Sequence, residues 1–289
     1  MRTKFSFKSV PQLMRNFRNY LLLIRFYNQI GTILLFIPCF LGLAFSKSLT
    51  FGNFFLFLSS SFFARSVGCI LNDVADKKID ANTPTTSHRI IASEKVSVKN
   101  AMLFAILLII IALPLIFFLS KNAFFPLGIS AIFVIIYPYS KRFFPVPQAF
   151  LGITYASGFL ICASHGLNIP FFLLNFNAFL IYLSLILWII FYDTIYAKRD
   201  FAFDKINKIR ASTVFFSKIS IPFLSENQRI NFALVVLCFA SNAILFLIEP
   251  IFLPIFCNAT LQILSIFTKP SLGFKLNALC IVPMFFWIA

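Results

Sequence analysis

Long apolar stretches alternate with short polar ones along most of the chain. A transmembrane helix needs about 20 mostly apolar residues, within a range of about 17–25. Nine stretches meet or approach this length. We predict one helix in each: Leu21–Phe45, Leu49–Leu71, Ala101–Leu119, Lys121–Tyr139, Gln148–Leu167, Phe171–Ala197, Asn231–Ile248, Ile251–Phe267 and Leu272–Ala289. The apolar stretch Ser212–Leu224 is short and contains Pro222, which predicts an interfacial or re-entrant segment.

The composition supports a protein embedded in a bilayer. Hydrophobic residues make up 60% of the 289 positions and charged residues only 12%, whereas soluble domains carry about 25% charged residues. The mean hydropathy is +0.91. The six cysteines show no C-x-x-C spacing, which argues against a zinc site. We therefore predict an all-α integral membrane protein with a single transmembrane domain over residues 21–289.

The basic residues indicate the topology of this domain. Cytoplasmic loops of membrane proteins carry an excess of Lys and Arg. With a cytoplasmic N-terminus, the nine-helix assignment leaves only Lys47 and Lys121 of the 25 basic residues on the outer side. A nucleic-acid-binding protein would instead gather its basic residues on one soluble surface. The net charge of +16 therefore reflects membrane topology, and we predict no nucleic-acid partner.

The first 20 residues hold five Lys and Arg residues and no acid. This composition is compatible with a mitochondrial presequence. No A-x-A-like cleavage site follows, and the next apolar stretch is too long for the core of a signal peptide. We favour a basic juxtamembrane arm over residues 1–20, held by anionic lipid.

All six aspartates fall in two short segments, each at the cytoplasmic end of a predicted helix. The first segment contains Asp73, Asp76 and Asp80, and the second contains Asp193, Asp200 and Asp204. On a continuous helix, the first three would lie within about 60° of one another and the second three within about 40°. Like charges so placed repel unless a cation lies between them. Carboxylates near a bilayer generally mark a functional site.

The chemistry of such a site follows from its oxygen ligands. Mg²⁺ typically takes one or two carboxylates and completes its shell with phosphates and water. Two facing clusters would hold Mg²⁺ around a diphosphate, and the metal would neutralise the leaving group as its C–O bond breaks. The structural alternative is that these are solvated helix ends with local counter-ions. A single D-x-x-x-D favours that alternative, but two clusters that together hold every aspartate argue against it.

Several basic residues accompany the acids at the same end of the predicted helices. Arg65 precedes the first aspartates by about two turns, and Arg25 lies at the inner edge of the first predicted helix. Lys141 and Arg142 follow the fourth helix, where basic residues that set topology by snorkelling are common. We interpret Arg65, within the helix, as a partner of a diphosphate or an aspartate.

Three segments resemble motifs of the UbiA superfamily of intramembrane prenyltransferases. Residues 72–80 resemble its first aspartate motif, NDxxDxxxD, and residues 192–204 resemble the second, YDxxYAxxDxxxD. Residues 137–152 are similar to the YPxxKR…PQxxLG segment of the 4-hydroxybenzoate polyprenyltransferase branch. Arg25…Ile30-Gly31 and Arg65…Gly68-Cys69 also match that branch, and the motifs occur in order over nearly the whole chain.

The resemblance implies a fold, a reaction and a site. The implied fold is a ring of nine helices around a central cavity that opens to lipid. The implied reaction joins a polyprenyl group from polyprenyl diphosphate to 4-hydroxybenzoate, ortho to its hydroxyl, in ubiquinone biosynthesis. The implied catalytic aspartates are the six named above, the implied Mg²⁺ ligands are Asn72, Asp76, Asp80, Asp200 and Asp204, and the implied substrate-binding residues are Arg25, Arg65, Asn72, Lys141, Arg142, Tyr192 and Tyr196.

The same resemblance places the protein in the bacterial inner membrane with a cytoplasmic active site, or alternatively in the mitochondrial inner membrane. The two substrates and the bilayer are the partners it implies, with no obligate protein partner. The chain also departs from the family pattern. The Arg-Pro-x-x-Ser-Gly that usually follows the first motif reads Arg89-Ile90-Ile91-Ala92-Ser93-Glu94, so Arg89 and Ser93 remain while Pro and Gly are lost. Phe201-Ala202-Phe203 replaces a charged run between Asp200 and Asp204.

Other functions stay open at this point. Related enzymes prenylate haem or other quinone precursors, or transfer phosphoribose to polyprenyl phosphate, and share the first motif. From a different class, a cation transporter places its carboxylates near the bilayer midplane. Aspartates at one membrane face beside Arg and Lys suit an anionic diphosphate better. An inactive paralogue would be expected to lose motif aspartates, and this chain retains them all.

Overall fold

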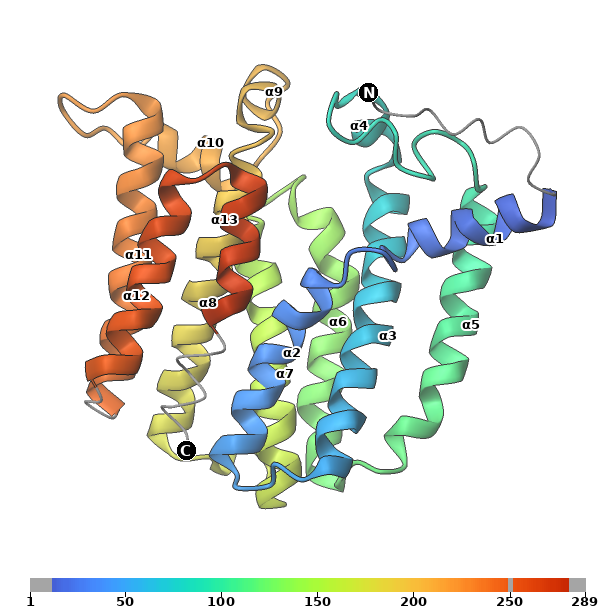
Figure 1. Cartoon of the computed structure of the whole chain (residues 1–289), viewed down its shortest axis with the longest axis vertical. Helices are drawn as coiled ribbons and strands as arrows, with labels where there is room; N and C mark the ends of the chain where they lie inside the picture. The colour runs from blue at the N-terminus through green and yellow to red at the C-terminus, as the bar shows by residue number, and fades with distance from the viewer. Residues whose placement is uncertain (1–11, 249–251, 281–289) are drawn as a thin grey trace, which may run out of the picture. The chain divides into compact units, whose positions relative to one another are not determined.

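The computed structural model describes residues 12–248 and 252–280, and every regular element within them is a helix (Figure 1). The helices are α1 (Gln12–Leu23), α2 (Ile30–Phe45), α3 (Phe51–Ala75), α4 (Lys77–Asn82), α5 (Val98–Ile116), η1 (Lys121–Ala123), α6 (Phe124–Ser140), α7 (Gln148–Leu167), η2 (Phe171–Leu173), α8 (Phe176–Ala197), α9 (Phe201–Ile206), α10 (Ser212–Ser217), α11 (Glu226–Ile248), α12 (Phe252–Phe267), α13 (Pro270–Leu276) and η3 (Asn277–Cys280). The predicted all-α fold is confirmed.

Among residues 12–248 and 252–280, six helices are long and apolar enough to cross a membrane: α3, α5, residues 121–140 (η1 with α6), α7, α8 and α11. The apolar helix α2 and the apolar part of α12 are shorter than a full span. The predicted ninth helix, Leu272–Ala289, lies partly outside the residues that the structure describes, and its described part forms α13 and η3. The expected count of nine spans is therefore not confirmed.

The chain divides into two compact units. The first comprises Met1–Gln29 and Phe63–Ala112, and the second comprises Ile30–Phe62 and Leu113–Ala289. In the first unit, α1 lies across the direction of α5 (Figure 1), and the Tyr20 ring meets the Phe104 ring edge-on with 4.9 Å between centroids. The two aspartate segments belong to different units.

The prediction of one helix over Leu21–Phe45 is wrong, because α1 ends at Leu23 and α2 begins at Ile30. Arg25 adopts the left-handed conformation, with φ 57°. The Phe26 N–H donates to the Leu21 carbonyl and the Arg25 N–H to the Leu22 carbonyl. This is the bonding pattern of a Schellman cap, in which glycine usually occupies the left-handed position. An arginine in that position gives no sequence signal for the end of a helix.

The prediction for Phe171–Ala197 placed the start of the helix too early. The short helix η2 comes first, and α8 begins at Phe176. Asn175 caps α8, since its Oδ1 accepts a hydrogen bond of 3.0 Å from the Ala178 N–H. Asparagine is among the preferred residues at this position.

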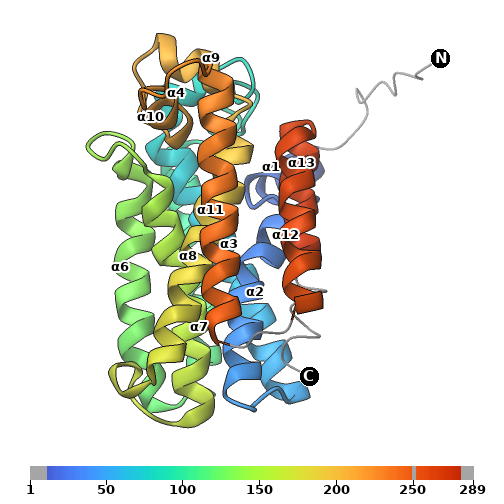
Figure 2. The ribbon, with the colours of Figure 1, turned by 90° about the vertical axis from the view of Figure 1, so that its left-hand side faces the viewer.

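The short apolar stretch predicted at Ser212–Leu224 is only partly helical. It forms α10, which ends at Ser217, and the residues after it are not helical up to α11. Figure 2 shows α9 and α10 at the end of the second unit where α8 ends and α11 begins. The membrane position of this stretch stays a prediction.

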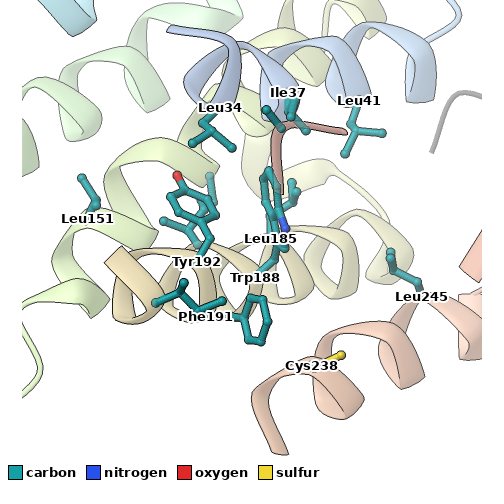
Figure 3. Close-up of a cluster of buried hydrophobic side chains, with 14 of the residues drawn as sticks. Leu34, Ile37, Leu41, Leu151, Leu185, Trp188, Phe191, Tyr192, Cys238 and Leu245 are labelled. Atoms are coloured by element: carbon teal, nitrogen blue, oxygen red, sulfur yellow. The ribbon is translucent and has the colours of Figure 1, made fainter. Parts of the chain in front are cut away.

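The core of the second unit is built around α8. Figure 3 shows Trp188, Phe191 and Tyr192 of α8 among apolar side chains of α2, α7 and α11. Trp188 and Tyr192 are each 1% exposed, and their rings meet edge-on with 5.0 Å between centroids. Such aromatic pairs stabilise beyond the area they bury, by about 0.5–1.5 kcal/mol. Tyr192 is therefore a core residue next to the second aspartate segment.

Helices α2 and α7 approach each other closely at small residues. A Cβ added to Gly42 would lie 2.5 Å from the Phe159 carbonyl oxygen and 2.8 Å from Cys162 Cβ. A Cβ on Gly158 would lie 2.7 Å from Cys39 Sγ. Small residues at helix contacts let the backbones of membrane helices come together.

Buried amides join α11 to α12. Asn258 Nδ2 donates to Asn242 Oδ1 over 2.8 Å, and Asn242 Nδ2 donates to Gln262 Oε1 over 3.1 Å. All three residues are at most 5% exposed. Hydrogen bonds between membrane helices contribute roughly 0.6–2 kcal/mol each. This cluster therefore stabilises the packing of α12 against α11, because apolar side chains alone favour a neighbouring helix only slightly over lipid.

We predict that Gly42→Ala destabilises the protein by about 1–3 kcal/mol, because backbone atoms of α7 occupy the space of the new methyl group. Gly128→Ala in α6 is the matched control, since nothing lies within 4 Å of its Cβ position. Alanine favours a helix by about 1 kcal/mol over glycine, so the control should be neutral or slightly stabilising. Thermal unfolding in detergent measures both, and equal midpoints for the two variants would contradict the close approach.

Candidate functional site

The first aspartate segment lies at a kink between two helices. Helix α3 ends at Ala75, Asp76 has φ −91° and ψ 6°, and α4 begins at Lys77. The expectation that Asp73, Asp76 and Asp80 share one face of a single continuous helix is therefore wrong. The Asp76 N–H still donates to the Asn72 carbonyl and the Asp80 N–H to the Asp76 carbonyl, over 2.9 and 2.8 Å. These bonds keep the four-residue spacing of Asn72, Asp76 and Asp80 through the kink.

Asp73 is the carboxylate of this segment that pairs with Arg25. It is 1% exposed, and both of its oxygens accept from Arg25 Nη2, at 2.7 and 2.9 Å. A buried carboxylate is strongly unfavourable unless a cation and hydrogen bonds compensate for the lost water. The predicted substrate-binding residue Arg25 therefore forms an ion pair with Asp73. The left-handed turn after α1 positions its side chain for this contact.

Arg89 links two aspartates of the segment. Its Nη1 lies 3.4 Å from Asp73 Oδ1 and 2.9 Å from Asp80 Oδ2. Burial raises the pKa of Asp80, and the Arg89 guanidinium opposes part of that rise. One guanidinium thus compensates two carboxylates that would otherwise repel each other.

A short anchored loop holds Arg89 in place. The neighbouring Ile90 and Ile91 are 3% and 0% exposed, and Ser93 Oγ donates to the Arg89 carbonyl over 2.7 Å. In the sequence, Arg89 is recognisable as a retained basic residue, but it is not among the predicted site residues. The sequence signal for its role is its position after the first motif, directly before two apolar residues that become buried.

The oxygen atoms of the first segment fit a magnesium ion. Asn72 Oδ1 is buried and has no hydrogen-bond partner in the structure, and an unpartnered buried carbonyl oxygen generally calls for a ligand or water. The donor set of Asn72, Asp76 and Asp80 contains oxygen alone, which is the preference of Mg²⁺. Within residues 12–248 and 252–280, no three His, Cys, Asp or Glu side chains gather as a metal site. Mg²⁺ does not require three, because substrate phosphates and water fill its shell.

Arg65 lies on α3, two turns before these aspartates. Its Nη1 contacts Cys69 Sγ one turn further along the same helix. Lys77 lies at the start of α4, and its ammonium pairs with Glu94 over 2.9 Å. The hydrogen bond from Lys77 lowers the pKa of Glu94. Lys77 is thus a local counter-ion of the loop, as expected for a solvated helix end. The aspartates, in contrast, are compensated by Arg25 and Arg89.

The second aspartate segment spans the end of one helix and the start of another. Asp193 lies on α8, which ends at Ala197, and Asp200 and Asp204 belong to the start of α9. The expectation that all three share one helix face is wrong, because residues 198–200 form a turn. The Asp204 N–H donates to the Asp200 carbonyl over 2.9 Å, which preserves the spacing of the predicted D-x-x-x-D pair.

An arginine and two tyrosines surround this turn. Arg199 Nη2 lies 3.2 Å from Asp200 Oδ2, and its guanidinium lies over the Tyr196 ring, 4.5 Å from the centroid. Tyr192 and Tyr196 both meet the ring of Phe274 on α13, with 5.6 and 4.9 Å between centroids. The predicted substrate-binding residue Tyr192 is thus fixed inside the core, while Tyr196 lies between Phe274 and the cation of Arg199.

The third motif lies at the end of α6 and the start of α7. Lys141 and Arg142 follow α6 directly, and the Arg142 guanidinium lies 5.0 Å from the centroid of Tyr139. Gln148 is buried, and its Oε1 accepts from the Ser212 N–H over 3.0 Å. This hydrogen bond fixes the start of α7 to α10, so Gln148 orders the backbone near the second segment.

The structure brings together Arg25, Asn72, Asp73, Asp76, Asp80 and Arg89 in the first unit, and Tyr192, Asp193, Tyr196, Arg199, Asp200 and Asp204 in the second. That the two groups face each other across one site stays a prediction. The ligand assignments of the individual residues likewise stay predictions.

Three comparisons relate this chain to known proteins. The model of the UbiA prenyltransferase family matches residues 35–287. A 4-hydroxybenzoate octaprenyltransferase of Legionella pneumophila (strain Lens) is 33% identical over 206 residues, which cover 68% of this chain and 70% of the relative.

Two solved structures share the fold. The apo structure of a UbiA homolog from Aeropyrum pernix K1 matches with a TM-score of 0.72 at 19% identity, covering 88% of this chain and 94% of that chain. A UbiA homolog from Archaeoglobus fulgidus bound to GPP and Mg²⁺ matches with a TM-score of 0.65 at 17% identity, covering 93% and 99%.

We predict that Arg89→Leu destabilises the protein by about 3 kcal/mol, because it leaves the nearly buried Asp80 carboxylate without its cation. Lys77→Leu removes an exposed pair and should cost less than about 1 kcal/mol. Adding Asp80→Asn to Arg89→Leu should recover part of the loss, since the unpaired charge is gone. Thermal unfolding of the parent, these three variants and Asp80→Asn alone measures the effects, and equal effects of Arg89→Leu and Lys77→Leu would contradict the proposed role of Arg89.

Proposed function

Because the chain belongs to the UbiA prenyltransferase family, as its motifs predicted, we propose that it transfers a polyprenyl group to 4-hydroxybenzoate with the aid of Mg²⁺. It is an integral membrane protein and a transferase of prenyl groups. The name of its Legionella relative supports 4-hydroxybenzoate as the acceptor. In the proposed reaction, the allylic C–O bond breaks, a C–C bond forms ortho to the acceptor hydroxyl, and the ring carbon loses its proton while diphosphate departs.

The observation that carries the proposal is the arrangement around Asp73 and Asp80. Two arginines compensate these carboxylates, and the unpartnered Asn72 Oδ1 lies on the same helix end. Such a mixture of anionic, cationic and neutral oxygen groups suits a metal-bound diphosphate. When bound, Mg²⁺ neutralises the diphosphate and acts as a Lewis acid on the leaving group.

The roles of the protein residues follow from this assignment. Asn72, Asp76 and Asp80 would hold one Mg²⁺, and Asp200 and Asp204 would hold another. Arg25 donates hydrogen bonds to Asp73 and lies in the left-handed turn after α1.

The basic residues at the same membrane face would serve the substrates. Lys141, Arg142 and Arg65 would contact the diphosphate. One arginine, Arg142 in our proposal, would bind the acceptor carboxylate, because a guanidinium matches a carboxylate in a bidentate geometry.

A cation transporter is disfavoured by the same geometry. A carboxylate that releases a translocated cation should not be permanently compensated by guanidinium groups. Both carboxylate oxygens of Asp73 accept hydrogen bonds from Arg25, and Arg89 bridges Asp73 and Asp80. These contacts suit a site that binds an anion through a metal ion and does not transport the metal across the membrane.

We place the reaction in the ubiquinone pathway and in the inner membrane of a bacterium, with the site on the cytoplasmic face. The bacterial source of the named relative and the distribution of Lys and Arg support this placement.

The first test uses membranes that contain the protein, radiolabelled 4-hydroxybenzoate and polyprenyl diphosphates of several chain lengths. We predict that label moves into the organic phase only when Mg²⁺ is present, and that a chelator stops the reaction. If the label stays in water at every chain length while another acceptor becomes prenylated, the acceptor assignment is wrong.

The second test separates the two aspartate segments. Asp76→Asn and Asp204→Asn should each lower turnover by at least about 100-fold, a scale typical for loss of one contact to developing charge. The exposed acid Glu94 provides the control, and Glu94→Gln should retain activity. Thermal unfolding verifies that every variant is folded, and near-normal turnover of a folded aspartate variant would contradict the metal sites.

A further inference from the structure

Lys198 occupies a junction in the second unit. It is the first residue after α8 and precedes Asp200 by two positions. Its Nζ donates to Asn231 Oδ1 on α11 over 2.9 Å and to the Ile266 carbonyl on α12 over 3.1 Å. A single side chain therefore ties the end of α8 to two other helices.

The hydrogen-bond partners of Lys198 are uncharged, although aspartates lie close to it in the sequence. Among the described residues, the Lys198 ammonium forms no ion pair and donates only to uncharged oxygens. The next residue, Arg199, is the one that pairs with Asp200. The two adjacent cations thus have separate roles, one toward neighbouring helices and one toward the aspartate.

The contact with Ile266 stabilises a helix end. Helix α12 ends at Phe267, so the Ile266 carbonyl is among the last four, which have no partner within the helix. A cation at this end also interacts favourably with the helix dipole. The partly buried ammonium is therefore hydrogen-bonded where it lies, and these contacts offset part of the cost of its burial.

The segment beyond Lys198 depends on this tie. Asp200 begins α9, and Asp204 follows one turn later. At the far end of α9, Lys205 pairs with Glu226 in the first turn of α11, over 2.5 Å. Both groups of that pair are almost half exposed, so it contributes little. Of these two connections to α11, the one through Lys198 is the less exposed.

We propose that Lys198 is a positioning residue, which fixes the turn that carries Asp200 and Asp204 so that these carboxylates meet metal and diphosphate. This inference rests on the proposed function. Lys198 itself does not contact the reacting groups, since its ammonium is engaged by α11 and α12. It acts through the backbone of residues 198–200.

The experiment compares Lys198→Met, which keeps the length of the side chain but removes the ammonium, with Lys198→Arg, which keeps a cation. Lys218→Met is the control, at an exposed lysine after α10. Two quantities are measured: the Mg²⁺ concentration at half-maximal turnover, and amide hydrogen exchange in residues 200–206 without metal.

We expect Lys198→Met to raise the Mg²⁺ requirement by about tenfold, the lower end of the range for loss of a group that orients metal ligands. Amide exchange in residues 200–206 should accelerate, while the KM for 4-hydroxybenzoate changes less than twofold. Lys198→Arg should restore at least part of both effects, and Lys218→Met should match the parent.

An unchanged Mg²⁺ requirement together with unchanged exchange in residues 200–206 overturns the proposal. So does a uniform acceleration of exchange over the whole second unit with an unchanged Mg²⁺ requirement, because Lys198 would then serve stability alone. Failure of the proposed function appears differently, as absence of 4-hydroxybenzoate prenylation by the parent protein. In that event the exchange measurement, which needs no turnover, still decides whether Lys198 fixes the segment.

Discussion

The burial of the Asp73 carboxylate is the constraint on which the arrangement of the first unit depends. A charge removed from water needs a cation with good geometry. Asp73 obtains this from Arg25 through both oxygens and from Arg89 through one. The left-handed conformation costs a residue other than glycine roughly 1–2 kcal/mol. Arg25 adopts it, with φ 57°, and the ion pair with Asp73 offsets that cost. The break between α1 and α2 is thus explained by an aspartate 48 positions away.

The two aspartate segments solve the problem of charge in different ways. The first is compensated over long sequence separations, by arginines 48 and 16 positions from Asp73. The second is compensated by its immediate neighbour, because Arg199 pairs with Asp200 and stacks on Tyr196. Its order comes instead from the core beneath it, where Tyr192 is fixed among apolar side chains, and from hydrogen bonds of Lys198 and Gln148. Both solutions leave a D-x-x-x-D spacing intact.

These differences explain which features the sequence predicts. The helix Gln148–Leu167 is predicted to the residue, because Pro147 precedes it and the left-handed Asn168 follows it. The spaced aspartates predict a site but not the breaks at Asp76 and at residues 198–200, because no Pro or Gly marks either break in the sequence. The role of Arg89 depends on how its loop folds back onto the aspartates, and the spacing of residues along the sequence does not reveal this. The Asn72 oxygen is identified only once its neighbours are placed.

The balance of charge favours metal and diphosphate binding as a pair. In the first segment, Asp73 and Asp80 pair with Arg25 and Arg89, and in the second segment Asp200 pairs with Arg199. Carboxylates at such a site repel a free diphosphate. A divalent cation would reverse this repulsion, and a bound diphosphate would in turn supply further oxygen ligands to the metal. Such coupling is reciprocal, so each ligand strengthens the binding of the other. In the proposed site, the arginines paired with Asp73 and Asp80 would weaken the binding of the metal alone, so we expect strong metal binding only together with diphosphate.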